Sequence, residues 1–156
     1  MAIRYRDLMS EITRSLPPLP IAEMGPPVLT LLKKPLREAR VMILTSAGVH
    51  LQDDPPFGSP NDMTFRRLPQ AVQASRLRCS HPTPVRRPSE EDINVVYPYQ
   101  RLAELAAEGF LGDVTEYHLS MLGAIKRLRD LVTEMAPRMA AEAKAAGADI
   151  VLHVPL

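Results

Sequence analysis

The sequence contains no tryptophan and only one cysteine, Cys79, in 156 residues. A single cysteine excludes an internal disulfide and any CxxC motif within these residues, so a reducing, cytoplasmic location is expected. Aromatic residues make up only 4%, so the rings on which proteins stack nucleic-acid bases are scarce. The net charge is +1, from 19 basic and 18 acidic residues, and such a balance attracts neither nucleic acid nor an anionic membrane.

Long apolar runs and common nucleotide-binding motifs are also absent. No stretch approaches the roughly 20 apolar residues of a membrane span, and no signal peptide is visible. Neither GxGxxG nor GxxxxGK[ST] occurs, so the sequence offers no evidence for a dinucleotide or a P-loop phosphate. The 46% hydrophobic and 24% charged content is typical of a folded globular protein. We therefore expect a globular protein that binds neither nucleic acid nor a membrane.

The chain is organised around a short apolar run at residues 41–44, Val-Met-Ile-Leu. The run is too short for a helix and predicts a strand that is buried on both faces. It ends in small or hydroxylated residues, among them Thr45, Ser46 and Gly48. Such residues leave room for a ligand to approach the backbone, and glycine adopts a positive φ without penalty.

Polar residues follow this strand, and His50 and Asp54 are the two that we consider functional candidates. The ligand sites of open α/β sheets lie at the carboxyl ends of the strands, so this loop is the first candidate site. His50 has the chemistry of a general acid or base, or of a hydrogen-bond donor to a substrate. The alternative is a buried strand followed by a solvated turn.

Residues 58–91 contain five prolines and little apolar periodicity, which predicts a long irregular insert of functional or disordered character. Arg66 lies beside Arg67 and an aromatic residue, and its planar fork suits a carboxylate. His81 lies in a proline-stiffened Ser-His-Pro-Thr-Pro segment, and is the second candidate for acid–base chemistry. The alternatives are ordinary surface charge for the arginines and a loop histidine bonded to a carbonyl for His81.

The remaining sequence alternates short β-branched runs with amphipathic helical stripes. Expected strands cover residues 92–97, 115–119 and 149–154, and expected helices cover 99–108 and 121–146. Pro137 should kink or split the second helix. The alternation implies right-handed crossovers and a parallel sheet.

We therefore predict an α/β domain over residues 40–156. It should have three layers and a mostly parallel sheet of the flavodoxin-like or Rossmann-like kind, with a long Pro-rich insert after the first strand. Residues 1–39 are predicted to form an N-terminal helix over residues 4–15 followed by a Pro-rich connector.

The four histidines lie at or near expected strand ends or in the insert, so several of them could converge at one sheet edge. No HxH, HExxH or paired-cysteine spacing is present, and we do not predict a metal site. The histidines are His50, His81, His118 and His153.

Five blocks of sequence carry a resemblance to a known family. In chain order they are TSAGVHLQDDPPF (45–57), TFRRLP (64–69), SHP (80–82), EDINVVYP (91–98) and LSMLG (119–123). Together they resemble the selenoprotein B family, which comprises the substrate-handling component of the glycine, sarcosine, betaine and D-proline reductases. The resemblance runs from about Val28 to the end of the sequence.

The resemblance implies an oxidoreductase that cleaves a C–N bond of a small amine or amino acid reductively. The family's redox centre is a selenocysteine or cysteine followed by Pro-x-Cys. A thioredoxin-like thiol system reduces the resulting bond, and in several members a pyruvoyl group on a partner subunit captures the amine. The expected partners are a pyruvoyl subunit, as the resemblance implies, and further copies of this chain in a homo-oligomer, although the sequence does not give the oligomeric state. The alternative is a non-catalytic relative that binds a small molecule, or a subunit of a larger complex.

The redox motif of the family follows directly after a strand like that at residues 150–156, and this sequence ends at Leu156. Cys79 lies in the insert and should not inherit the redox role. We expect the natural protein to continue past Leu156, at a selenocysteine codon that also serves as a stop codon. The expected site is one cleft at the carboxyl edge of the sheet, with catalytic and substrate-binding groups. The catalytic residues would be His50 and His81, and the substrate-binding residues Thr45, Ser46, Gly48, Asp54 and Arg66.

Overall fold

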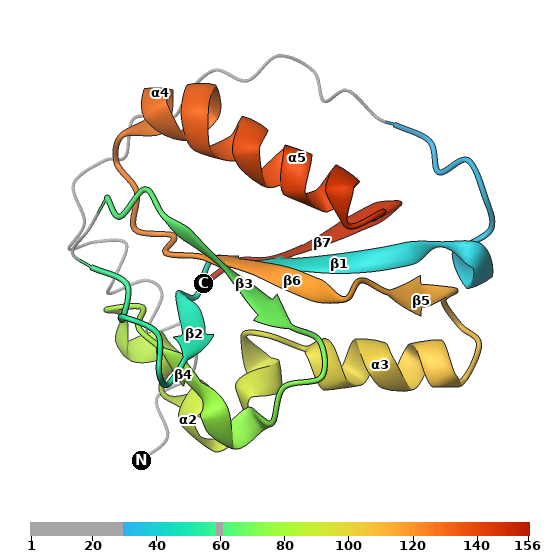
Figure 1. The fold of residues 1–156 in the computed structure, drawn as a ribbon. Coiled ribbons are helices and arrows are strands. Elements are labelled where there is room, and N and C mark those ends of the chain that lie inside the picture. The colour runs from blue at the N-terminus through green and yellow to red at the C-terminus, as the bar shows by residue number, and fades with distance from the viewer. Residues whose placement is uncertain (1–29, 59–60) are drawn as a thin grey trace, which may run out of the picture. The chain divides into compact units, whose positions relative to one another are not determined.

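Strand β1 (Arg40–Thr45) lies in the middle of the sheet and is buried on both faces (Figure 1). Successive side chains of a strand point to opposite faces. Val41 and Ile43 accordingly pack in one apolar cluster, and Met42 packs in the other. The apolar run at residues 41–44 thus forms the doubly buried strand that it predicted.

A computed structural model describes residues 30–58 and 61–156 of the chain. Within it, Leu32–Leu156 form one compact unit. The helix predicted over residues 4–15 lies outside the described residues, as does most of the Pro-rich connector. In the described ranges, no helix is long and apolar enough to cross a bilayer.

The sheet is mixed, with mostly parallel strands. β1 pairs in parallel with β7 (Ile150–Val154), β5 (Asp113–Val114) and β6 (Tyr117–Met121). β3 (Phe65–Pro69) adds an antiparallel strand beyond β6. The parallel pairing of the first and last strands is as predicted, and the expected strand at 115–119 is present as β6, displaced by two residues.

Regular structure in the 58–91 segment corrects the prediction of an irregular insert. Besides β3, the segment contributes β4 (Leu77–Cys79), which pairs antiparallel with β2 (Val49–Leu51) as a separate small sheet. Pro69 ends β3 at the margin of the sheet, where a missing N–H is tolerated. Short edge strands of this kind carry little apolar periodicity.

The prediction of a strand at residues 92–97 is wrong. The chain there follows α2 (Pro88–Glu91) with a 3-10 turn, Ile93–Val95. The Asp92 carboxylate accepts a hydrogen bond from the Asn94 backbone N–H at 2.9 Å, which favours a turn over an extended chain. Val96 and Tyr97 are nevertheless buried, so the apolar run packs against the sheet without joining it.

Helices cover both faces of the sheet (Figure 1). α3 (Tyr99–Ala107) packs on the face of Val41 and Ile43, and it ends before Gly109, whose φ is 75°, as predicted. α4 (Leu128–Asp130), a π-helical turn (Leu131–Met135) and α5 (Ala136–Ala145) lie on the other face. This α/β arrangement is compatible with the predicted three layers, while the flavodoxin-like or Rossmann-like type stays a prediction.

The long helix starts later than the predicted residue 121. β6 extends through Met121, and Leu122 continues the contact as a bridge to Ala47, so residues 121–127 are not helical. The π-helical turn runs directly into α5, and Pro137 is the second residue of α5. Because proline lacks an N–H and its ring crowds the carbonyl four residues earlier, the wider turn is the local adjustment that its position required.

Candidate functional site

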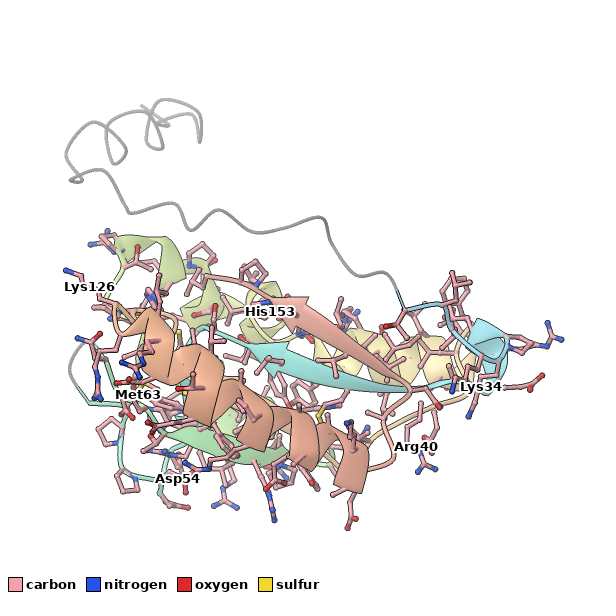
Figure 2. The ribbon with its side chains drawn as sticks, turned by 90° about the horizontal axis from the view of Figure 1, so that it is seen from above. Lys34, Arg40, Asp54, Met63, Lys126 and His153 are labelled. Carbon is pink, nitrogen blue, oxygen red and sulfur yellow. The ribbon has the colours of Figure 1, made fainter. Side chains whose placement is uncertain are left out.

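The carboxyl ends of the parallel strands meet at one edge of the sheet, beside the small β2–β4 sheet (Figure 1). Thr45 at the end of β1 is paired with Val154 of β7 and with Ser120 of β6. Asp54, Met63 and Lys126 lie toward this end of the domain, whereas Lys34 and Arg40 lie at the other end (Figure 2). The candidate residues that follow β1 therefore start from the edge where open α/β sheets bind ligands.

Thr45 and Ser46 are buried, and their hydroxyls form hydrogen bonds with backbone groups of neighbouring segments at this edge. Thr45 Oγ1 donates to the Val96 carbonyl at 2.7 Å and accepts from the Ala47 N–H at 3.2 Å. Ser46 Oγ accepts from the Leu156 N–H at 2.9 Å. In this structure both side chains shape the edge, and the Ser46 hydroxyl fixes the residues that follow β7.

Gly48 is the tight point between the two sheets. Its φ is 64°, and a Cβ added to it would lie 3.1 Å from Leu122 Cδ1. Its N–H donates to the Met121 carbonyl at 2.8 Å, and its carbonyl accepts from the Ser80 N–H at 3.0 Å. The glycine thus lets the β2–β4 sheet approach the end of β6 closely, at a φ that other residues rarely adopt.

His50 lies in β2 and both of its ring nitrogens are engaged. Nδ1 lies 2.7 Å from the Leu51 carbonyl oxygen, which can only accept, so Nδ1 carries the proton. Nε2 lies 2.8 Å from Ser80 Oγ and therefore accepts the hydroxyl proton of the serine. His50 is 5% exposed, and its ring lies at 71° to the ring of Phe57, with 6.3 Å between the ring centroids. The Ser80 hydroxyl is therefore the group through which the buried His50 ring can contact solvent or a ligand.

His81 follows Ser80 and is also buried, with 9% of its surface exposed. Its Nδ1 accepts from the Thr83 N–H at 3.3 Å. Burial lowers the pKa of His81 below its ordinary value, because the charged imidazolium is poorly solvated there. The imidazole is therefore neutral near pH 7.

Arg66 lies on β3, and the Phe57 ring contacts both the Arg66 guanidinium and the His50 ring. Its guanidinium carbon lies 4.5 Å from the centre of the Phe57 ring, within the range of a cation–π contact. Its Nη1 donates to Thr64 Oγ1 at 2.8 Å, and its Nη2 donates to the Pro55 carbonyl at 3.4 Å. The guanidinium of Arg66 is therefore held in place, and some of its N–H groups already donate to the protein.

Asp54 closes a turn. Its backbone N–H donates to the Leu51 carbonyl at 3.0 Å, and its carboxylate accepts from the Leu51 N–H at 3.3 Å. These bonds fix the chain after β2. A contact between Asp54 and a substrate stays a prediction.

The structure thus gathers three candidates at the β2–β4 pair: His50 lies in β2, Gly48 directly precedes β2, and His81 follows β4 after Ser80. Arg66 and His50 contact the same Phe57 ring. Sequence reasoning did not assign a role to Ser80, the residue that joins His50 to this group. Its signals were its position next to His81 and its place in the SHP block. The contact with His50 could not be predicted, because the β2–β4 register cannot be derived from two such short segments. The common cleft and the roles of the seven candidate residues stay predictions.

The other two histidines lie elsewhere. His118 lies in β6 and is fully buried, its Nδ1 accepts from the Ile43 N–H at 3.1 Å, and burial lowers its pKa to about 4. His153 is exposed on β7. Within residues 30–58 and 61–156, no group of three or more His, Cys, Asp or Glu residues could hold a metal ion.

Comparison with curated proteins finds the D-proline reductase subunit gamma of Acetoanaerobium sticklandii. It is 30% identical over 127 residues, which are 81% of this chain and 52% of that protein. The chain therefore spans about half the length of the curated relative that it matches. No family model and no solved structure matches the chain. The similarity supports a relationship to reductase proteins, while the selenoprotein B resemblance stays a prediction.

Proposed function

We propose that this chain is the substrate-handling part of an amino-acid reductase that cleaves a C–N bond reductively. The observation that carries the proposal is the 30% identity to D-proline reductase subunit gamma over most of the chain. The substrate would be a small amine or amino acid of the kind of D-proline, glycine, sarcosine or betaine. The protein would act as one subunit of a complex.

The chemistry of the carboxyl edge supports this proposal. His81, whose Nδ1 accepts from the Thr83 N–H, could donate a hydrogen bond from Nε2 to a substrate, and the guanidinium of Arg66 could orient a substrate carboxylate. His50 exchanges a proton with the surroundings only through Ser80, because its other nitrogen is bonded to the backbone. These residues would bind, orient and protonate a substrate without themselves being redox centres.

The attacking atom is a separate part of the proposal. Cys79 Sγ on β4 donates to the Ala47 carbonyl at 3.1 Å, so the thiol is turned toward the backbone. We propose that a selenocysteine or cysteine joined to Leu156 supplies the nucleophile. Since the Leu156 N–H is bound by Ser46 Oγ, such a residue would start from the carboxyl edge. A thioredoxin-like reductant and a pyruvoyl group on a partner subunit would complete the reaction, as the family resemblance implies.

A second candidate is a non-catalytic relative that binds a small molecule or serves as a subunit of a larger complex. The observation that favours it is the state of Cys79, which is the only cysteine in this sequence and whose thiol is hydrogen-bonded to the backbone. On this alternative the same edge binds a ligand but performs no reductive cleavage.

Ligand binding tests what the two candidates share. Calorimetric titration of the 156-residue chain with D-proline, glycine, sarcosine and betaine should show saturable binding of one of them. Arg66→Ala should weaken binding of a carboxylate ligand at least tenfold, because a charge-assisted hydrogen bond contributes about 1.5–3 kcal/mol. Arg129→Ala, on the exposed α4 helix, is the matched control and should change nothing. Absence of binding by all four ligands would contradict the reductase candidate.

The coding sequence beyond codon 156 separates the two candidates. It should continue in frame and encode a selenocysteine or cysteine followed by Pro-x-Cys, and where the residue is selenocysteine, protein isolated from its native organism should contain selenium. A conventional stop codon without such a frame, together with selenium-free native protein of this same length, would exclude the reductase and favour the binding protein.

A further inference from the structure

Ser80, His50 and the Leu51 carbonyl form a chain of three hydrogen-bonding groups. The Ser80 hydroxyl donates to His50 Nε2 at 2.8 Å, and His50 Nδ1–H donates to the Leu51 carbonyl at 2.7 Å. A nucleophile, a base within hydrogen-bonding reach and a third group that orients the base is the arrangement that activates serine in covalent catalysis. Here a backbone carbonyl takes the place of the usual carboxylate.

The surroundings hold the base in the required tautomer. His50 is 5% exposed and packs at a steep angle against the Phe57 ring, and the Arg66 guanidinium lies over Phe57. Because the Leu51 carbonyl accepts the Nδ1 proton, Nε2 is left as a proton acceptor that faces the serine. The imidazole ring therefore cannot flip without breaking both hydrogen bonds.

The serine is the accessible end of this chain. Ser80 directly follows β4 and is only half-buried, whereas His50 behind it is almost fully enclosed. The Ser80 backbone is fixed by its N–H bond to the Gly48 carbonyl at 3.0 Å. A reagent that approaches the carboxyl edge thus meets the hydroxyl before it meets the imidazole.

We propose that Ser80 is an activated nucleophile that accepts an acyl group from a small carboxylic ester or thioester. Ser80 Oγ attacks the carbonyl carbon, and its proton passes to His50 Nε2. The tetrahedral adduct collapses, the C–O or C–S bond of the leaving alcohol or thiol breaks, and the leaving group takes the proton from His50. The product is an O-acyl serine and a free alcohol or thiol, with no change in oxidation state. Water then hydrolyses the ester by the same proton path. This activity does not depend on the proposed reductase function.

Covalent labelling of the intact 156-residue chain tests this assignment. The protein is incubated with a fluorophosphonate probe and, separately, with p-nitrophenyl acetate, and the modified residue is located by peptide mass spectrometry. Both reagents should modify Ser80. His50→Gln should slow the modification about 100-fold or more, the usual size of general-base assistance.

The controls separate activation from simple exposure. Ser75→Ala removes an exposed serine on the preceding 3-10 turn and should leave the labelling rate unchanged. Ser80→Ala should abolish the adduct, with circular dichroism confirming that the variant is folded. A wild-type chain that stays unmodified at Ser80 overturns the proposal without reference to any variant. Labelling of Ser80 at the same rate in folded His50→Gln overturns it equally.

Discussion

At the scale of single residues, His118 lies between the pairings of β1 with β5 and with β6. β5 pairs with the start of β1 and β6 with its end, and between them the His118 imidazole accepts the Ile43 N–H. The ring must be neutral to accept that bond at Nδ1. Its Nε2 has no hydrogen-bond partner among the described residues. The fold therefore depends on a histidine that is kept uncharged.

This dependence predicts that stability falls in mild acid. The folded pKa of His118 is about 4, against 6.5 for the ordinary value. Stability is thus fully present above pH 6.5 and is lost as the pH falls toward 4, because the unfolded chain takes up a proton that the folded chain refuses. The slope is roughly 1.4 kcal/mol per pH unit within that window, and burial of His81 acts in the same direction.

Urea unfolding at pH 7, 6 and 5 measures the effect. His118→Gln should flatten the dependence on pH, while His153→Gln, which removes an exposed histidine of β7, should leave the slope as it is. Equal slopes in wild type and His118→Gln would contradict the assignment.

Gly48→Ala is the second substitution whose effect follows from one residue. A positive φ costs a residue with a Cβ about 1–2 kcal/mol, and the new Cβ would also crowd Leu122 at 3.1 Å. Gly109 has a similar φ of 75° but open space around it. Gly109→Ala should therefore lose only the conformational part. Thermal unfolding of both variants gives the comparison, and an equal loss would show that the contact with Leu122 is unimportant.

At the scale of elements, sequence patterns predicted those parts that bury a continuous apolar surface. β1, α3 and the π-interrupted long helix follow from runs and stripes that tertiary packing reinforces. β3, β2 and β4 could not be predicted, because they are short, lie at margins and are held by backbone pairing rather than by a periodic apolar face. The same limit applies to the site, since Ser80 and His50 meet only through the β2–β4 register.

The prediction of a strand at residues 92–97 failed for a different reason. The apolar residues of this segment suit a strand, but the Asp92 carboxylate bonds to the Asn94 N–H and Asn94 Nδ2 and so turns the chain. Asp92→Ala should therefore lower the midpoint of thermal unfolding. Glu91→Ala, an exposed neighbour, provides the comparison and should not. A shift of the same size in both variants would mean that the Asp92 bonds do not determine the turn.

At the scale of the whole molecule, one sheet separates two apolar clusters. Met42 and Ile43 are adjacent in β1, yet each lies fully buried in a different cluster. A strand that belongs to both clusters should make them unfold together. Met42→Ala and Ile43→Ala should each cost about 2–5 kcal/mol, and each should shift one single transition.

Circular dichroism and tyrosine fluorescence follow that transition, and their curves should coincide in wild type and in both variants. If either variant separated the two curves, the clusters would be independent and β1 would not couple them.

The hydrogen-bonded thiol of Cys79 has a practical use. It is the only cysteine in the sequence, it immediately precedes Ser80, and a cavity of about 510 Å³ opens beside it. A maleimide dye or a nitroxide spin label can therefore be attached to the unmutated chain at one known position of β4. Changes in the emission or mobility of that reporter would follow events at the carboxyl edge in real time, with every residue of the candidate site left in place.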